Sequence, residues 1–300
     1  MSFTIATTLD EALAAVAAGA RPVAGGSDLV VGARQGKAPL PDSVVAIDRI
    51  AEIRGICPGD DGGLYLGALT THNELETHPG VVAAYTALAD AAALVGSPAT
   101  RNVGTIGGNV MNASPAMDAG APLVVLGAQV ALRSATGART VAVDDLWIGP
   151  GRTSAAPGEL CTTVHLPARP ERSGSAYLRL EYRRAMEIAV VGAAASVTLN
   201  EDGTLAAVAI ALTAVAPTIL AVTGTDALVG RPVDEATLAA VAELAAEQAT
   251  PISDLRATDA YRRHTVGVMA RRAVAAAADR ARGVHIAVPV NRAQGIGAAR

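Results

Sequence analysis

The chain has 300 residues, 51% of them apolar, and a net charge of −4, so it can bury a large hydrophobic core and is not globally disordered. The acidic balance argues against a nucleic-acid-binding protein, and one Phe, one Trp and five Tyr are too few for a surface on which bases stack. No apolar run approaches the ~18 residues of a transmembrane helix, and residues 1–4 do not open a secretory signal, which favours a cytoplasmic protein. Cys57 and Cys161, the two cysteines, cannot by themselves hold an iron–sulfur cluster or a structural zinc ion.

Up to residue 167 the chain alternates between strand and helix patterns, as α/β units do. A capping box formed by Thr8 and Glu11 starts the first helix, and Ser27 is the predicted N-cap of the second. Short apolar runs between turn residues predict strands over residues 3–6, 21–24, 44–47, 64–69, 129–133 and 160–166. Helices are predicted over residues 28–34 and 81–95, and an irregular, glycine-rich segment over residues 96–120.

Residues 167–173 carry two prolines and three charges and are predicted to be a linker. The segments predicted after it are strands over 176–182, 189–199 and 205–213, a hairpin turn at 201–203, and helices over 219–228, 234–247 and 258–280. The sequence therefore predicts an α+β protein with two small N-terminal α/β subdomains and a C-terminal domain of a three-stranded antiparallel sheet with helices. The predicted boundaries are 1–55, 56–167 and 168–285, followed by a glycine- and alanine-rich tail over 286–300.

A pair of glycines separates a predicted strand from a predicted helix in the segment Ala24-Gly25-Gly26-Ser27-Asp28-Leu29. Glycine permits positive φ and the close approach of a ligand, and N–H groups at the start of a helix attract anions such as a pyrophosphate. An ordinary strand-to-helix turn accounts for the same residues, so this segment by itself leaves both interpretations open.

A second glycine-rich segment runs from Gly104 to Asp118. Ile106 is predicted to anchor it in the core while the glycines expose backbone amides, and Asn112 and Ser114 add hydrogen-bonding side chains. Neither segment has the spacing of a dinucleotide fingerprint or of a Walker A motif. Two separate glycine loops that reach one ligand fit a long dinucleotide held between two α/β subdomains.

The sequence signals for a metal-binding site or a serine hydrolase site are weak. His72 and His78 do not have the spacing of a zinc protease and are predicted to lie at solvated helix ends. Ser154 and Ser173 lie in predicted loops without a nucleophile elbow. We therefore assign no catalytic residue and no metal ligand.

Five segments, in order, resemble the FAD-binding medium subunit of molybdenum hydroxylases of the carbon monoxide dehydrogenase and xanthine dehydrogenase type. They are the two glycine segments at 24–29 and 105–109, the run 112–118, the run Tyr182-Arg183-Arg184-Ala185-Met186-Glu187-Ile188-Ala189, and the segment 254–272. The resemblance covers residues 3–283 and makes coincidence improbable.

This resemblance implies a PCMH-type FAD-binding domain, formed by the two N-terminal subdomains, with the C-terminal domain packed over the flavin. The first loop is expected to wrap the pyrophosphate, and the second to add backbone and hydroxyl contacts. Asp118 matches an acidic residue that contacts the cofactor, Arg179 a basic position near the flavin ring, and Cys161 an apolar contact. Val95 stands where some members have an aromatic residue. The implied cofactor-binding residues are Val23, Ala24, Gly25, Gly26, Ser27, Asp28, Leu29, Val95, Thr105, Ile106, Gly107, Gly108, Asn109, Asn112, Asp118, Cys161 and Arg179.

The same resemblance implies partners. A large subunit is expected to carry the molybdenum cofactor and a small subunit two [2Fe–2S] clusters, in a dimer of heterotrimers. The FAD of this chain is expected to pass electrons from those clusters to an external acceptor. The complex is expected in the cytoplasm, with association with the inner face of the membrane left open.

Two other functions stay open. A stand-alone FAD-dependent oxidoreductase of the same superfold needs an acid or base over the flavin, and the matching segments offer none. A non-enzymatic nucleotide-binding or scaffolding protein would hold redox-silent FAD or no FAD. The substrate of the complex, whether carbon monoxide, a purine, an N-heterocycle or an aldehyde, depends on the large partner.

Overall fold

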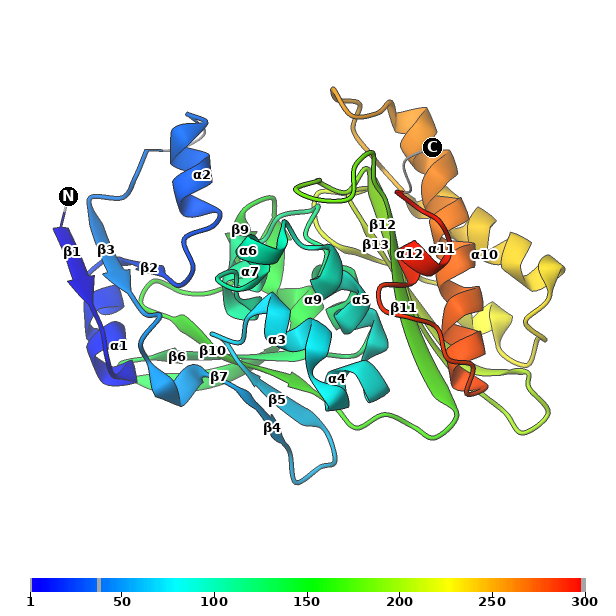
Figure 1. Ribbon diagram of the computed structural model, residues 1–300, viewed down its shortest axis with the longest axis horizontal. Coiled ribbons are helices and arrows are strands. Elements are labelled where there is room, and N and C mark those ends of the chain that lie inside the picture. Colours follow the sequence, from blue (N-terminus) through cyan, green and yellow to red (C-terminus); the bar gives the residue numbers. More distant parts are fainter. Residues whose placement is uncertain (1, 37–38, 298–300) are drawn as a thin grey trace.

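The structure is a computed structural model that describes residues 2–36 and 39–297. Three principal sheets follow one another along the molecule, from the N-terminal sheet at the left to the C-terminal sheet at the right (Figure 1). In these described ranges no helix is long and apolar enough to cross a bilayer. This arrangement agrees with the predicted α+β class.

The first sheet is parallel and is covered by the helix α1. Its strands, in spatial order, are β1 (Ser2–Ile5), β3 (Ser43–Ala46) and β2 (Arg21–Val23), and the helices are α1 (Leu9–Ala17) and α2 (Leu29–Arg34). The predicted capping box of Thr8 and Glu11 is confirmed at the start of α1. Ser27 is not the N-cap of α2, which is Asp28, because Gly26 has φ +66° and the backbone becomes helical only at Asp28.

The second sheet has five antiparallel strands. In spatial order they are β4 (Ile56–Pro58), β5 (Leu64–Gly67), β10 (Leu160–Leu166), β6 (Gln129–Ser134) and β7 (Gly137–Ala142). The helices of this region are α3 (His72–Thr77), α4 (Pro79–Ala84), α5 (Thr86–Leu94), α6 (Pro98–Arg101), α7 (Ile106–Asn112), α8 (Gly120–Val125) and α9 (Val143–Leu146), with the 3₁₀ turn η1 (Ala51–Ile53) and the short strands β8 (Trp147–Gly149) and β9 (Arg152–Thr153). Apolar residues of β5, β6, β10, α5, α7 and α8 form its core.

Two predictions for this region are wrong. The single helix over residues 81–95 is two helices with a break at Tyr85, whose hydroxyl donates to the carbonyl of Pro167 at 2.9 Å. The segment over 96–120 is not irregular throughout, because it contains the helices α6 and α7. Thr105 is the N-cap of α7 and accepts from the Gly108 amide, so the glycines lie in the first turn of a helix.

The third sheet is antiparallel, with strands in the order β11 (Ser173–Leu180), β12 (Val191–Leu199), β13 (Leu205–Thr213) and β14 (Leu220–Ala221). Its helices are α10 (Glu235–Gln248), α11 (Asp259–Ala281) and α12 (Val290–Ala293), with the 3₁₀ turn η2 (Thr225–Leu228). The hairpin turn over 201–203 is confirmed, and Gly203 has φ +84° there. The predicted helix over 219–228 is replaced by η2 and by β14, which pairs with the open edge of β13 and makes the three predicted strands four.

The predicted tail packs against the sheet as far as residue 297. Val290 and Asn291 in α12 are fully buried. The Asn291 side chain accepts from the amide of Arg179 at 3.0 Å and donates to its carbonyl at 2.9 Å. A side-chain amide thus satisfies the free edge of β11, which explains why this segment does not extend into solvent.

A buried carboxylate on α5 joins the second sheet region to the C-terminal domain. Asp90 accepts from both terminal nitrogens of Arg280, at 2.6 and 3.1 Å, and from the backbone amides of Val290 (2.9 Å) and Tyr177 (3.2 Å). Burial raises the pKa of Asp90, and Arg280 and the two amides oppose that rise. One side chain therefore connects α5, β11, α11 and the segment that begins α12.

Replacing Asp90 with Asn is expected to lower the free energy of unfolding by about 3 kcal/mol or more, because Arg280 is left as a buried charge without a counter-ion. Denaturant unfolding of the full chain measures the loss. Asp60→Asn, at an exposed turn position, is the matched control and is expected to change stability by less than about 0.5 kcal/mol. Equal losses in the two variants would contradict this role of Asp90.

Candidate functional site

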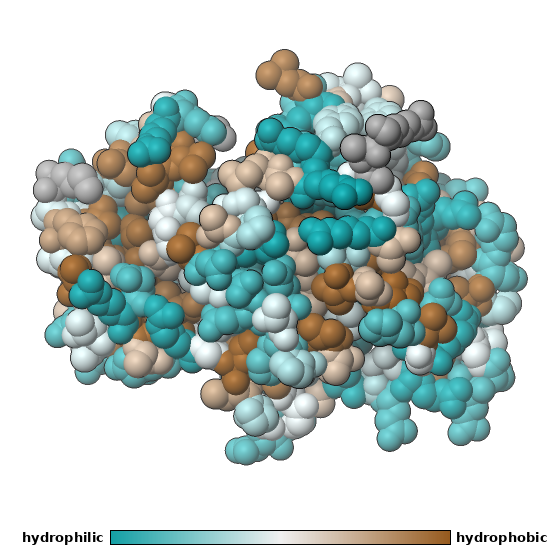
Figure 2. Space-filling model, in the orientation of Figure 1, coloured by the Kyte–Doolittle hydropathy of each residue, from teal (hydrophilic) through white to brown (hydrophobic). Residues whose placement is uncertain are grey.

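The two glycine segments predicted from the sequence meet backbone to backbone. A Cβ atom added to Gly25 would lie 1.8 Å from the carbonyl oxygen of Val103, just before the second segment. No residue other than glycine fits at that distance, so Gly25 is required for the approach of the two loops. Figure 2 shows the surface hollowed beside this region, between the N-terminal lobe at the upper left and the C-terminal domain at the upper right.

The first loop leaves backbone donors available. Among the residues that the structure describes, no group accepts from the amides of Gly25, Gly26 or Ser27, which directly precede α2. Backbone donors that have no acceptor among the described residues favour an anionic oxygen such as that of a phosphate. The contact of this loop with a pyrophosphate stays a prediction.

The backbone amides of the second segment are hydrogen-bonded within the protein, contrary to the prediction that its glycines expose them. The amides of residues 106–109 donate at 2.9 to 3.1 Å to the carbonyls of Thr70, Ala68 and Thr105 and to the Thr105 hydroxyl. Gly107 is needed for packing, because an added Cβ would lie 2.6 Å from the Cβ of Ala68. Contacts from this segment to a ligand must therefore come chiefly from side chains.

One such side chain has an unused polar atom. The Asn109 Oδ1 atom is buried and has no hydrogen-bond partner within the described part of the chain. A buried acceptor left without a donor costs about 1–3 kcal/mol. A ligand hydroxyl or N–H group at this position would remove that cost.

His72 lies against the second segment and is buried, not at a solvated helix end as predicted. Its amide donates to the carbonyl of Gly104 at 3.0 Å, and a Cβ added to that glycine would lie 3.3 Å from Cδ2 of the His72 ring. Burial lowers the pKa of His72 to about 4, and the charge of Arg101 adds to the shift. The imidazole is therefore neutral at physiological pH.

The side chains of Asp118 and Arg179 form an ion pair that is buried in the interior of the protein. The Asp118 carboxylate accepts from the Tyr177 hydroxyl at 2.9 Å and from Arg179 at 2.7 Å, and Arg179 also bonds to Glu181 at 2.8 Å. Burial raises the pKa of Asp118, and the neighbouring Arg179 opposes that rise. Burial lowers the pKa of Arg179, but the adjacent acidic groups outweigh it and leave it raised. Both side chains thus bind the C-terminal sheet to the second sheet region.

The remaining predicted residues divide between the loops and the core. Cys161 lies in β10, and its side chain is part of the core of the second sheet region. Burial there raises the pKa of its thiol to about 12. Val95 is half-buried at the end of α5, and the amide of Met186 in the β11–β12 hairpin donates to the carbonyl of the next residue, Gly96, at 2.8 Å. Ile106 is fully buried, as predicted. Val23, Ala24, Leu29 and Asn112 are also half-buried, and Asp28 is exposed.

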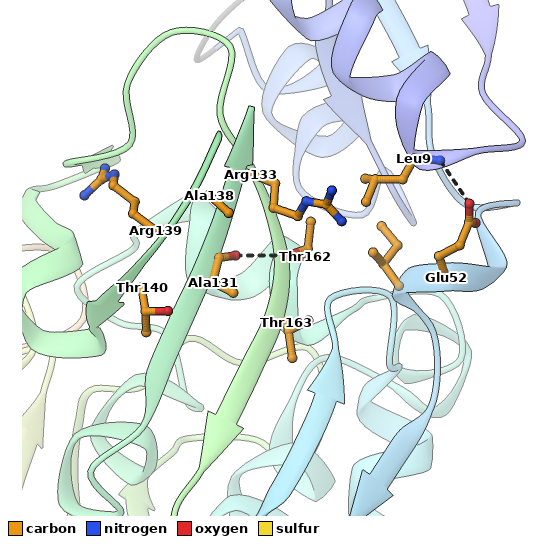
Figure 3. A pocket seen from close by; sticks show the side chains of 10 residues that line it. Leu9, Glu52, Ala131, Arg133, Ala138, Arg139, Thr140, Thr162 and Thr163 are labelled. Carbon is orange, nitrogen blue, oxygen red and sulfur yellow. Dashed lines mark hydrogen bonds between the residues drawn. The ribbon is translucent and has the colours of Figure 1, made fainter. Parts of the chain in front are cut away.

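A separate cavity of about 490 Å³ lies between the N-terminal sheet region and the strands β6, β7 and β10 (Figure 3). Leu9 and Glu52 line one side, and Arg133, Thr140 and Thr163 line the other. None of the predicted cofactor-binding residues lines it. It is therefore distinct from the region where the two glycine loops meet.

Two family models match this chain and identify the family to which it belongs. A family model for the FAD binding domain in molybdopterin dehydrogenase matches residues 1–169, and one for the CO dehydrogenase flavoprotein C-terminal domain matches residues 176–277. The chain belongs to the FAD-binding subunits of the molybdenum hydroxylases. As a member of this family it binds FAD and is a component of an oxidoreductase.

Individual relatives agree with this family. The carbon monoxide dehydrogenase medium chain of Afipia carboxidovorans is 35% identical over 88% of this chain and 90% of the relative. The xanthine dehydrogenase FAD-binding subunit of Escherichia coli O157:H7 is 30% identical over 78% and 80%. Among solved structures, a reconstituted CO dehydrogenase from Oligotropha carboxidovorans matches with a TM-score of 0.88 at 32% identity, over 93% of this chain and 98% of that one. Quinoline 2-oxidoreductase from Pseudomonas putida 86 matches with a TM-score of 0.87 at 28% identity, over 95% and 98%.

Sequence reasoning missed several buried residues whose polar groups join distant elements. Asp90 had a usable signal, because it is the one acidic residue in the otherwise apolar run of α5. His72, Tyr177 and Asn291 had none, since their partners lie far away in the sequence.

The buried His72 is expected to make the flavoprotein less stable as the pH falls from 6.5 to 4. The unfolded chain binds a proton there near pH 6.5 and the folded chain only near pH 4, so stability is full above 6.5 and declines below it, by about 3 kcal/mol at pH 4. Denaturant unfolding at several pH values measures the decline. His72→Gln is expected to remove most of this pH dependence, whereas substitution of the half-buried His165, His165→Gln, is expected to preserve it. A His72→Gln variant with the slope of the parent chain would contradict the assignment.

Proposed function

We propose that this chain is the electron-transfer subunit of a molybdenum hydroxylase, taking electrons from [2Fe–2S] clusters of a small partner subunit and passing them through FAD to an external acceptor. The observation that carries the proposal is the meeting of the two glycine loops at Gly25 and Val103, beside three amides without an acceptor. Membership of a family of FAD-binding subunits supports the same assignment.

We assign the residues that hold FAD by the kind of group each offers. The amides of Gly25, Gly26 and Ser27 bind the pyrophosphate, and the segment 23–29 as a whole wraps it. The Asn109 Oδ1 atom accepts from a hydroxyl or N–H group of the dinucleotide. The residues present therefore fit the cofactor.

The chain's other predicted residues act on the flavin end of the site. Val95 packs on the ring as an apolar contact, and the hairpin of residues 181–190, bonded to Gly96, covers it. Asp118 and Arg179 hold the C-terminal domain that bears this hairpin, rather than offering free charges to the cofactor. Bound FAD supplies the capacity to take electrons singly and release them in pairs. The chain itself binds the FAD, orients it and shields it from solvent.

The assembly follows from the same proposal. A large subunit bears the molybdenum cofactor and the small subunit bears two [2Fe–2S] clusters, in a dimer of heterotrimers. Among the described residues of this chain, no cluster of His, Cys, Asp or Glu is able to hold a metal ion. Location in the cytoplasm, and association with the inner face of the membrane, stay predictions.

Replacing Gly25 with Ala is expected to weaken FAD binding about 10- to 100-fold, because the added Cβ would force the two loops apart. The measurement is FAD per chain, and its dissociation constant, in the complex purified through a tag on the full chain. Gly32→Ala is the matched control: it lies in α2, and no atom is within 4 Å of its added Cβ. It is expected to retain FAD. Equal FAD content in both variants would reject this loop as the binding site.

Electron transfer itself is tested in the purified complex by rapid mixing with carbon monoxide, a purine, an N-heterocycle or an aldehyde. The iron–sulfur absorbance is expected to bleach before the flavin absorbance. In the Gly25→Ala complex, the iron–sulfur bleaching is expected to persist while acceptor reduction is lost. Turnover of a substrate by the isolated, FAD-loaded chain would instead favour a stand-alone oxidoreductase.

A further inference from the structure

The cavity of about 490 Å³ in Figure 3 forms no part of the proposed FAD site, and its first wall is the outer face of the five-stranded sheet. Thr163, Ala131 and Thr140 are paired in register on β10, β6 and β7, so their side chains share one face of the sheet. Val130 and Val164, on the other face, belong to the hydrophobic core. The volume is typical of a small-molecule site and much larger than a packing void.

The second wall of the cavity comes from the N-terminal sheet region. Leu9, the first residue of α1, and Ile53, in η1, are buried and give this wall an apolar surface. The Glu52 carboxylate accepts from the amide of Leu9 at 3.4 Å through one oxygen, and its other oxygen has no partner among the described residues. The amide and the positive end of α1 therefore hold a negative charge at this wall (Figure 3).

Arg133 brings a positive charge to the same cavity. Its side chain extends from β6 toward the wall that carries Leu9 and Glu52 (Figure 3). Its guanidinium makes no ion pair or hydrogen bond within the described part of the chain. Arg139, the other arginine of the lining, points away from Glu52 and bonds to Glu159 through two nitrogens, at 2.7 and 2.8 Å. Arg133 is therefore the cation that is available to a ligand.

The two charges lie on opposite walls and do not form an ion pair with each other. A ligand with one negative charge would be attracted by Arg133 and repelled by Glu52, and a ligand with one positive charge would meet the reverse. A ligand with charges of opposite sign at its two ends satisfies both walls. The apolar surface of Leu9 and Ile53 suits a short aliphatic middle part. The half-buried Thr163 hydroxyl, which has no partner among the described residues, adds a donor for the anionic end.

We propose that this cavity binds a small zwitterion whose anionic group pairs with Arg133 and whose cationic group pairs with Glu52. The two walls belong to different sheet regions, so the bound zwitterion joins the N-terminal sheet region to the five-stranded sheet. None of the predicted cofactor-binding residues lines the cavity, so the site is independent of the proposed function.

The test titrates the purified full chain with ω-amino acids of increasing length, from glycine to 6-aminohexanoate, at constant ionic strength. Calorimetry measures the dissociation constants, and saturation-transfer NMR detects the weaker ligands. One length is expected to bind best, because the charges of the ligand must match the separation of Glu52 and Arg133. The matched acid and amine, such as hexanoate and hexylamine for 6-aminohexanoate, each lack one charge and are expected to bind about 10-fold more weakly or worse.

Substitutions identify the two charged partners. Arg133→Gln and Glu52→Gln are each expected to weaken binding of the best ω-amino acid about 10-fold or more. Glu52→Gln keeps an oxygen for the Leu9 amide but no longer repels an anion, so the matched acid is expected to bind this variant more tightly than the unchanged chain. Arg139→Gln is the matched control, because Arg139 lines the same cavity but is bonded to Glu159. It is expected to leave the dissociation constant little changed.

The comparison of ligands on the unchanged chain needs no substitution, so a variant that fails to fold does not decide the outcome. Absence of binding by every ω-amino acid overturns the proposal. Binding of the matched acid, or of inorganic phosphate, as tight as that of the best ω-amino acid also overturns it, because the cavity would then be an anion site. Equal losses of affinity in Arg133→Gln and Arg139→Gln would reject Arg133 as the partner of the anionic group.

Discussion

The position of the C-terminal domain depends on the ion pair between Asp90 and Arg280. The carboxylate lies in the middle of α5, one of the most apolar helices of the chain, and every donor that reaches it comes from residues after 170. Removing a carboxylate and a guanidinium from water is costly, and the cost is offset only when geometry and hydrogen bonding are complete. Here two guanidinium nitrogens and two backbone amides meet the two carboxylate oxygens. The pair thus specifies one arrangement of the domains more than it adds stability.

A second buried network reinforces this arrangement, and its Tyr177 lies on the face of the C-terminal sheet that packs with α5. Asp118, Tyr177, Arg179 and Glu181 connect the segment after α7 to β11. The backbone of Arg179 is in turn held by Asn291, so the C-terminal segment closes over the edge of the strand. Tyr177 belongs to both networks, because its backbone amide donates to Asp90 and its hydroxyl donates to Asp118. The hairpin that follows β11 is thereby held against Gly96, whose carbonyl accepts from the Met186 amide.

The site combines groups of two kinds. Some have no partner among the described residues and so are open to a ligand: the amides of Gly25, Gly26 and Ser27 and the side-chain oxygen of Asn109. Others shape the protein around them, such as Gly107, which lets α7 lie close to Ala68, and His72, which packs neutral against Gly104. The sequence pattern does not separate the two kinds, because both demand glycine or a small polar residue. Only the destination of each backbone hydrogen bond tells them apart.

Sequence alone determined the class of fold, the capping box at Thr8, the hairpin at Gly203, the importance of the two glycine segments and the family. These are local properties: helix caps, turns and motif spacing depend on residues a few positions apart. The tertiary structure decided that the second segment is a helix start, that residues 290–293 pack rather than trail, and that Asp118 and Arg179 are an internal pair. It also decided that Asp90 meets Arg280 across 190 positions of sequence. Such contacts follow from how whole elements pack and from where desolvated charges find their partners, which no local pattern encodes.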